Sequence, residues 1–356
     1  MTEKERFQRA FAPLHASPDT LTEVRKTMRN EKKTRRALGK SAVVAIAAAL
    51  TLTIAVAGGI VTLIRADVSP ADKVDDTTHH AFTDDLDATT PTVDDGKGTA
   101  VSVPDMERIP GDIQTTQRLV GQYLSKLDAE MTVEGNTIRL GTLLIDESGS
   151  GMLTYSVENP DGVKYTDAGY GEAVDMSAEP SMWLDSAPDA QGYGGTCITS
   201  RCHVDEDAST DTRLQVVLYF AAGKDFQKGD DFYFTVRDSA YQPYSIAIQP
   251  QTYVPVKTMT AKNGEIVTLS ALGMTIVNPD PSREIHTDEV LVNAKDGSSF
   301  AVESSSKNLM NWVIGSITGD GQAAFANYTY VFNRLVDVNE VGSVTLTGYY
   351  LSLIPI

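Results

Sequence analysis

The chain has 356 residues, of which 48 are Asp or Glu and 30 are Lys or Arg, so its formal net charge is −18 at pH 7. An apolar fraction of 41% and a charged fraction of 22% exclude a wholly disordered chain, and the length allows two or three domains. The acidic excess gives no reason to expect direct binding to nucleic acid, and two cysteines are too few for a disulfide-built scaffold.

The segment 41–64 differs most from an ordinary soluble sequence. It consists of SAVVAIAAALTLTIAVAGGIVTLI, which is 24 residues without a charge, bracketed by Lys40 and Arg65. As a helix it would be about 36 Å long, enough to cross a hydrocarbon core of about 30 Å. A buried core helix usually stops well short of this length, and the apolar region of a cleaved signal peptide is shorter and nearer the start. The sequence therefore predicts one uncleaved transmembrane helix.

Charge sets the expected orientation of this helix. Residues 1–40 hold 11 Lys or Arg and 5 Asp or Glu, whereas the rest of the chain holds 19 and 43. Because basic flanks stay on the inner side, we expect a single-pass protein of the cell membrane with a cytoplasmic N-terminus and an extracellular C-terminus. The basic residues before the span are also expected to contact anionic lipid headgroups of the bilayer.

Residues 1–40 contain two short apolar stripes at helical spacing. The second predicted helix begins at Ser17, a good N-cap, and Pro18 and Asp19 suit its first turn. Two such helices bury too little to fold alone, so the stripes form a face either for a protein partner or for the membrane surface. The residues of this predicted partner-binding face are Phe7, Phe11, Leu14, Leu21, Val24 and Met28.

Residues 65–110 are predicted to be an acidic flexible linker. They include DKVDDTTHH and FTDDLDATTPTVDDGKG, with few large apolar side chains to offset the entropy of ordering. A flexible coil of about 40 residues would span roughly 35 Å on average. Such a linker would hold the outer region clear of the bilayer.

The remaining sequence predicts an extracellular region that is mainly β. Residues 111–252 begin with a helix over 112–127 and continue as short strands separated by turns such as Asn159–Gly162. Residues 253–356 form a second domain, with hairpin turns at Asn263-Gly264 and Asp296-Gly297. Many short strands with frequent turns indicate two β-sandwich-like domains. The expected fold class is this mainly β ectodomain with one transmembrane helix and short cytoplasmic α-helices.

The two cysteines, Cys197 and Cys202, lie close together in GGTCITSRC. Outside the cell they would form a disulfide that closes a small surface loop. A zinc site would need more ligands than the adjacent His203 supplies, so the pattern favours a disulfide over a metal.

No pattern of catalytic or metal-binding residues is complete. Residues 304–307 have the Ser-x-x-Lys spacing of penicillin-binding enzymes, but the Ser-Asp-Asn and Lys-Thr-Gly companions are absent from the sequence. The acidic stretches near His79 and near His203 lack the spacing of an EF-hand and are expected to be solvated loops. The sequence thus predicts a protein that is not an enzyme, with no metal and no cofactor.

Three phrases resemble one known type of protein. The phrase Phe7–Val24 resembles the start of membrane-anchored anti-sigma-factor-like proteins of Gram-positive bacteria, and the phrases Leu144–Tyr155 and Phe332–Val338 are similar to motifs of their uncharacterised extracellular β-rich region. The resemblance implies that cytoplasmic helices hold an extracytoplasmic-function sigma factor while the outer domains sense a signal. Zinc-type anti-sigma domains carry a histidine and two cysteines in this segment, whereas this chain has His15 and no cytoplasmic cysteine.

These observations favour a membrane signalling protein with a sigma factor as its inner partner and an unidentified extracellular ligand. The alternative is a surface-exposed binding or adhesion protein without a sigma partner. Deletion of the first 30 residues would distinguish the two, because only the first requires them.

Overall fold

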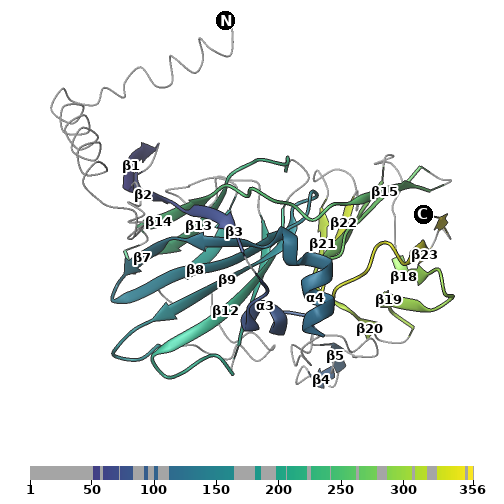
Figure 1. Cartoon of the computed structure of the whole chain (residues 1–356), viewed down its shortest axis with the longest axis horizontal. Coiled ribbons are helices and arrows are strands. Elements are labelled where there is room, and N and C mark those ends of the chain that lie inside the picture. Colours follow the sequence, from purple (N-terminus) through teal and green to yellow (C-terminus); the bar gives the residue numbers. More distant parts are fainter. Residues whose placement is uncertain are drawn as a thin grey trace, which may run out of the picture. The chain divides into compact units, whose positions relative to one another are not determined.

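The computed structural model describes residues 51–355 with gaps at 57–58, 72, 83–91, 95–99, 103–111, 164–180, 186–197, 206, 223–225, 241, 262–263, 279–286, 307–308, 319–326 and 349–351. Strands dominate this part of the chain and are grouped in several sheets (Figure 1). The expectation of a mainly β region is confirmed. The predicted cytoplasmic helices over 1–40 lie outside the described residues.

The first pair of sheets contains the strands up to residue 248. One sheet has five strands in the order β1 (Thr51–Val56), β2 (Gly59–Arg65), β14 (Pro243–Ile248), β13 (Phe232–Arg237) and β10 (Ser181–Asp185). The other has the order β11 (Thr199–Val204), β12 (Arg213–Ala221), β9 (Ser150–Glu158), β8 (Asn136–Ile145), β6 (Ser125–Asp128) and β3 (Asp67–Pro70), with β7 (Glu130–Val133) also paired to β8.

An apolar core lies between these two sheets. Tyr155 and Phe220 from one sheet join Phe232 and Phe234 from the other, and all four are buried. The rings of Tyr155 and Phe234 lie 5.0 Å apart between centroids, and those of Phe220 and Phe232 lie 5.6 Å apart. Edge-tilted aromatic pairs of this kind add to the stabilisation from area burial. Alternate side chains of each strand face this core, and in β9 and β12 the side chains between them are buried as well.

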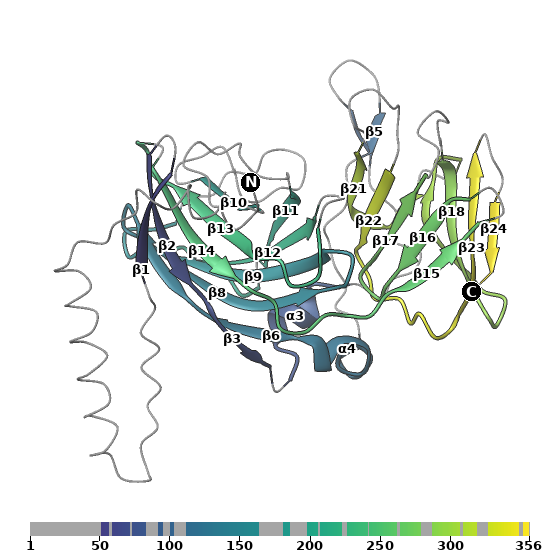
Figure 2. The ribbon, with the colours of Figure 1, turned by 90° about the horizontal axis from the view of Figure 1, so that it is seen from above.

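The second pair of sheets contains the strands from residue 257 onwards. One has the order β15 (Lys257–Thr260), β16 (Ile266–Leu269), β17 (Gly273–Val277), β22 (Asn327–Phe332) and β21 (Trp312–Thr318). The other has the order β20 (Leu309–Met310), β19 (Ser299–Ser304), β18 (Thr287–Ala294), β23 (Val341–Gly348) and β24 (Ser352–Pro355). Figure 2 shows these strands side by side in their sheets. A further two-stranded sheet joins β4 (Thr92–Asp94) to β5 (Ala100–Ser102).

The second pair has an apolar core of its own, made by Ile276 and Tyr330 from one sheet and Val292 and Val344 from the other. The predicted Asp-Gly turn between β18 and β19 is confirmed, with Gly297 at a φ of 91°. This left-handed conformation costs glycine nothing, whereas most residues are strained in it.

A helix precedes β6, but it is shorter than the sequence predicted. α4 (Ile113–Val120) begins after Asp112, whose carboxylate accepts a hydrogen bond from the Thr115 amide at 2.8 Å, and a 3-10 turn (Gly121–Tyr123) follows. The prediction extended the helix to residue 127, yet β6 begins at Ser125. Leu124 and Leu127 belong to different apolar clusters, so an extended chain is needed to bury both.

Part of the predicted linker is folded, which corrects the expectation for residues 65–110. β3 pairs with β6, and a short helix, α3 (Asp76–His80), packs against β12 (Figure 1). Val74, Ala81 and Phe82 are buried in the cluster that also contains Leu144 and Tyr219. Composition suggested disorder because the few apolar residues in this acidic segment are scattered, but Val74, Ala81 and Phe82 fill places in an existing core.

The described part of the predicted transmembrane segment is extended. β1 and β2 form an antiparallel hairpin, with Thr51 opposite Ile64, and β2 pairs in parallel with β14. Within the part of the chain that the structure describes, no helix is both long and apolar enough to cross a bilayer. A continuous apolar run suits a buried strand as well as a helix, so periodicity alone does not separate them. Residues 41–50 lie outside the described residues.

Candidate functional site

The structure bears on few of the predicted site residues. The partner-binding face, Phe7, Phe11, Leu14, Leu21, Val24 and Met28, lies outside the described residues. So does Cys197, and the disulfide therefore stays a prediction. Cys202 is buried in β11, where its Sγ atom lies 3.6 Å from the hydroxyl oxygen of Tyr155. Burial and this contact raise the pKa of the Tyr155 phenol well above its ordinary value.

The Ser-x-x-Lys motif does not adopt the geometry of a nucleophile. Ser304 is the last residue of β19, is buried, and donates a hydrogen bond to Glu289 at 3.2 Å. The nucleophile of penicillin-binding enzymes lies at the start of a helix, whereas Ser304 lies at the end of a strand. Lys307 lies outside the described residues.

The acidic stretch after β11 is arranged as a turn. Asp205 is buried and accepts a hydrogen bond from the Ala208 amide at 3.2 Å, and its carbonyl accepts one from the Ser209 hydroxyl at 2.6 Å. Among the described residues, no group of three or more His, Cys, Asp and Glu side chains is placed to hold a metal ion.

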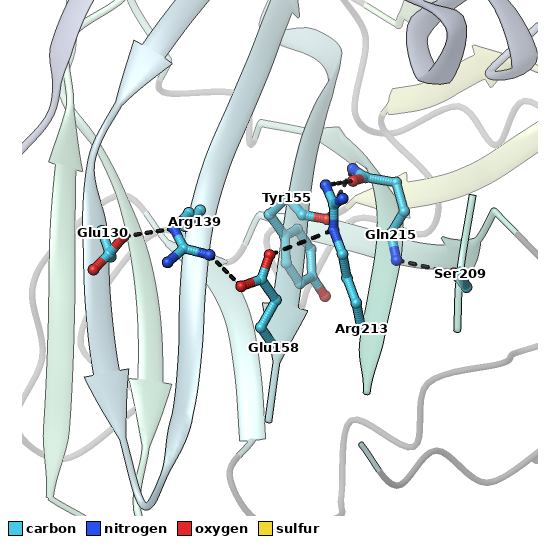
Figure 3. Close-up of polar contacts among 7 residues, drawn as sticks. All are labelled: Glu130, Arg139, Tyr155, Glu158, Ser209, Arg213 and Gln215. Atoms are coloured by element: carbon cyan, nitrogen blue, oxygen red, sulfur yellow. Dashed lines mark hydrogen bonds and ion pairs between the residues drawn. The ribbon is translucent and has the colours of Figure 1, made fainter. Parts of the chain in front are cut away.

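A row of charges crosses the outer face of β7, β8, β9 and β12 (Figure 3). Arg139 lies 2.6 Å from Glu130 and 2.5 Å from Glu158, and Arg213 lies 3.5 Å from the second oxygen of Glu158. The hydrogen bonds that Arg139 donates to Glu158 and Glu130 raise the pKa of its guanidinium above the ordinary value. All four side chains are more than a third exposed, so each pair contributes well under about 1 kcal/mol to stability. Their charges alternate in sign along the row, so each charge has a partner of opposite sign.

The most elaborate polar arrangement lies where the two sheet pairs meet. Asp146 follows β8, is fully buried, and forms an isolated parallel bridge with Val254 in the connection to β15. Its Oδ1 atom accepts from the Ser148 amide at 2.8 Å, the Ser148 hydroxyl at 2.7 Å and the Ser150 amide at 2.9 Å. Its Oδ2 atom accepts from the hydroxyl of Ser270, in the second sheet pair, at 2.6 Å.

Ser270 completes this network on the other side. Its hydroxyl oxygen accepts from the amides of Leu272 at 3.0 Å and Gly273 at 3.1 Å while it donates to Asp146. Burial raises the pKa of Asp146 above its ordinary value of 3.8, and the donors of Ser270, Ser148 and Ser150 limit the rise. We call Asp146, Ser148, Ser150 and Ser270 the junction network.

Apolar side chains surround the junction network. Leu144 and Met152 from the first sheet pair belong to the same buried cluster as Leu272, Ile314 and Val331 from the second. The turn between β8 and β9 needs glycine at position 149, because a Cβ atom there would lie 2.6 Å from Ala222, and its φ is 88°. The two sheet pairs are thus joined by a buried, well-satisfied interface rather than by a loose connection.

At the edge of the junction lies a partly exposed ion pair. Glu147 lies 2.7 Å from the Lys228 amine, which also sits 5.2 Å from the centre of the Tyr253 ring. Lys228 lowers the pKa of Glu147 below its ordinary value of 4.5 despite some burial. The hydroxyl of Tyr253 accepts a hydrogen bond from the Gly229 amide at 2.9 Å.

The Glu147 pair predicts a pH-dependent contribution to stability. A lowered folded pKa means that the pair stabilises the protein above the unfolded pKa and that this gain is lost as pH falls through the folded value. We expect Glu147→Gln to lower the urea midpoint slightly at pH 7 and to have no effect at a pH below the folded pKa. In a Lys228→Met background the pH dependence of the Glu147→Gln effect should shrink to the part due to the Val256 amide, which also donates to Glu147, and a pH dependence as large as with Lys228 present would contradict the assignment to this pair.

Sequence reasoning missed the junction network, although a signal was present. Asp146 follows the apolar run from Leu143 to Ile145 and precedes Ser148 and Ser150, so an acid at a strand end faces short hydroxyl side chains. Such a pattern indicates a carboxylate that accepts local backbone and hydroxyl hydrogen bonds. It cannot indicate that Ser270, far along the chain, supplies the remaining donor.

A second buried polar group lies in the other phrase that carries the family resemblance. Arg334 is 1% exposed, its guanidinium donates to the Asn311 side chain at 2.5 Å, and it lies 5.0 Å from the centre of the Phe300 ring. Nearby, Asp337 lies 2.5 Å from Arg118 of α4. Both phrases therefore contain residues that organise the interior of the β region and its connections.

Comparison with known proteins adds no identity: no protein family model, no curated protein and no solved structure matches this chain.

Proposed function

We propose that this chain is a single-pass membrane signalling protein that holds a sigma factor through its cytoplasmic helices and senses a signal through two extracellular β-sandwich domains. The observation that carries the proposal is the uncharged 24-residue run that follows a basic N-terminal segment. Its length suits a bilayer, and its flanking charges suit an N-terminus in the cytoplasm.

The hairpin of β1 and β2 and a membrane span are alternative conformations of the same residues. β14 pairs with β2 only from Thr62 to Arg65. A helix over residues 41–61 would be about 31 Å long, which still suits a hydrocarbon core of about 30 Å. Anchoring in this way gives up the pairing of β1 with β2 and keeps the pairing of β2 with β14.

The joined sheet pairs also support a signalling role. A ligand on one sheet pair can affect the rest of the molecule only if the parts move together or share a two-state contact. The junction network and its apolar surroundings provide a continuous buried connection between the sheet pairs. A pure adhesion protein needs no such connection, although it could possess one.

A search of the neighbouring genes for a sigma factor, followed by a binding measurement, tests the inner half of the proposal. Full-length protein in nanodiscs should capture a sigma factor encoded there at micromolar concentration, and the absence of such a gene would count against the proposal. Phe11→Asp and Val24→Asp should each reduce capture at least about tenfold, because each would place a charge in an apolar contact. A tenfold reduction corresponds to a loss of about 1.4 kcal/mol of binding free energy.

The matched control is Thr22→Asp, which adds the same charge outside the apolar stripe and should leave capture unchanged. Absence of capture by the wild-type protein would rule out the sigma-binding role and favour the surface-binding alternative. Equal loss with all three variants would instead point to a general effect of negative charge near the membrane.

A further inference from the structure

Two short helical segments lie against the place where the two sheet pairs meet. The first, residues 74–82, contains α3, and the second, residues 112–124, contains α4 and the 3-10 turn that follows it (Figure 1). We call these two segments the strap. They are joined by a hydrogen bond, which the Val74 amide donates to the side-chain oxygen of Gln117 at 2.9 Å. Gly121 leaves room for that side chain, because a Cβ atom there would lie 2.0 Å from the side-chain nitrogen of Gln117.

Polar contacts attach the strap to the first sheet pair. The Oδ1 atom of Asp75 accepts from the Thr78 amide at 2.7 Å and so caps α3, while its Oδ2 atom accepts from the Thr142 hydroxyl of β8 at 2.9 Å. At the other end of α3, the Tyr219 hydroxyl of β12 donates to the Ala81 carbonyl at 2.5 Å. Both ends of α3 are therefore fixed to strands of the first sheet pair.

α4 attaches the strap to the second sheet pair. Arg118 lies 2.5 Å from Asp337, but the Arg118 side chain is 60% exposed, so this ion pair contributes little to stability. The stronger attachment is apolar. Val120 and Leu124 are buried in the cluster that also contains Leu272 of the second sheet pair, and burial of such side chains is the larger stabilising effect.

The strap contributes to the packing between the sheet pairs and not to the packing within them. The apolar cluster around the junction network takes its members from both sheet pairs, from the connection between them and from the strap, which supplies Val74, Ala81, Phe82, Val120 and Leu124. Among the described residues, the two cores inside the sheet pairs contain no member of the strap. Loss of strap packing therefore removes apolar contacts at the junction and leaves both inner cores complete.

From this arrangement we infer that the strap and the junction network open together as one local unit while the inner cores of both sheet pairs stay folded. Cooperative units smaller than the whole molecule open at a lower free energy than global unfolding. Opening of this unit frees the second sheet pair to move relative to the first, and such a two-state contact is what transmission of a signal between them requires. The inference depends neither on a membrane span nor on a sigma factor.

Hydrogen exchange of the full-length chain in detergent, followed by mass spectrometry of its peptides, tests this inference. Val120→Ala removes strap packing at the junction, where Val120 is fully buried. We expect exchange to become at least about tenfold faster in the strap and also in the junction peptides, which contain residues 146–150 and 270–273. Exchange should stay unchanged in β13 and β23, whose buried side chains belong to the inner cores.

Val292→Ala is the matched control, because it makes the same change at a buried valine in the inner core of the second sheet pair. It should speed exchange in β23, which pairs with β18, and leave exchange in the strap unchanged. Unchanged exchange of the junction peptides in Val120→Ala would overturn the inference. Faster exchange in every peptide of that variant would do so too, since the strap would then open only with the whole molecule.

A second variant tests the hydrogen bond within the strap. Gln117→Ala removes the bond to Val74 and leaves the apolar cluster complete, so it should give the pattern of Val120→Ala with a smaller increase in exchange. Gln114 is an exposed residue of the same helix, and Gln114→Ala should change nothing. Faster exchange of the strap in Gln117→Ala without faster exchange of the junction peptides would show that the two open separately, which contradicts the inference.

Discussion

Asp146→Ala is expected to lower the free energy of unfolding of the β region by about 2–4 kcal/mol, the largest single effect in the junction. The substitution leaves the amides of Ser148 and Ser150 and the hydroxyl of Ser270 without their acceptor in a buried place. Removing a buried carboxylate also relieves its desolvation, which offsets part of the loss. The unpaired donors and the space left behind outweigh that gain.

The same substitution should also change the shape of the unfolding curve. The Ser270 bond connects the two sheet pairs, so its loss weakens their coupling as well as their stability. We expect urea unfolding followed by tryptophan fluorescence and by circular dichroism to give coincident curves for the wild-type protein. For Asp146→Ala the curves should separate, and coincident wild-type-like curves would contradict the role of the network.

Asp146→Asn serves as the sharper comparison. The Oδ1 position faces three donors, so the new amide group must point towards Ser270. The Ser270 oxygen already accepts from Leu272 and Gly273, and an amide donor finds no remaining lone pair there. We expect this variant to lose about 1–3 kcal/mol. The exposed turn residue Asp161, replaced by alanine, should change stability by less than about 0.5 kcal/mol.

Phe82→Ala is expected to lower the free energy of unfolding of the β region by about 3–5 kcal/mol, because the substitution removes a whole buried ring. Phe82 is 3% exposed and belongs to the cluster that includes Leu144 and Tyr219. The segment around it is fixed in place, because Tyr219 donates to the Ala81 carbonyl at 2.5 Å and Thr142 donates to Asp75 at 2.9 Å. A residue in a flexible linker would show almost no effect.

Ile113→Ala provides the matched control for Phe82. Ile113 is also a large apolar residue, but it is 43% exposed at the start of α4. Its truncation should cost far less, within about 1 kcal/mol, since little buried surface is lost. If both substitutions lowered the free energy of unfolding in urea by the same small amount, residues 65–110 would behave as the flexible linker that composition predicted.

Sequence reasoning predicted local features of the β region. The Asp-Gly turn at position 297 depends only on neighbouring residues, and it was predicted. The end of α4 was predicted wrongly. Leu124 and Leu127 continue the apolar spacing of a helix, but in the structure they lie in two separate apolar clusters. The junction network could not be predicted either, since its two halves are more than a hundred residues apart.

By itself the sequence determined that this protein has a mainly β region, because strand periodicity and turn residues are encoded over a few positions. Only the tertiary structure decided that Val74 and Phe82 belong to a core, that β2 pairs with β14, and that Asp146 meets Ser270. Each of these depends on which distant segment lies opposite. Whether a residue is buried, and which residue it contacts, depends on two segments at once. The composition of one segment does not say which distant segment packs against it.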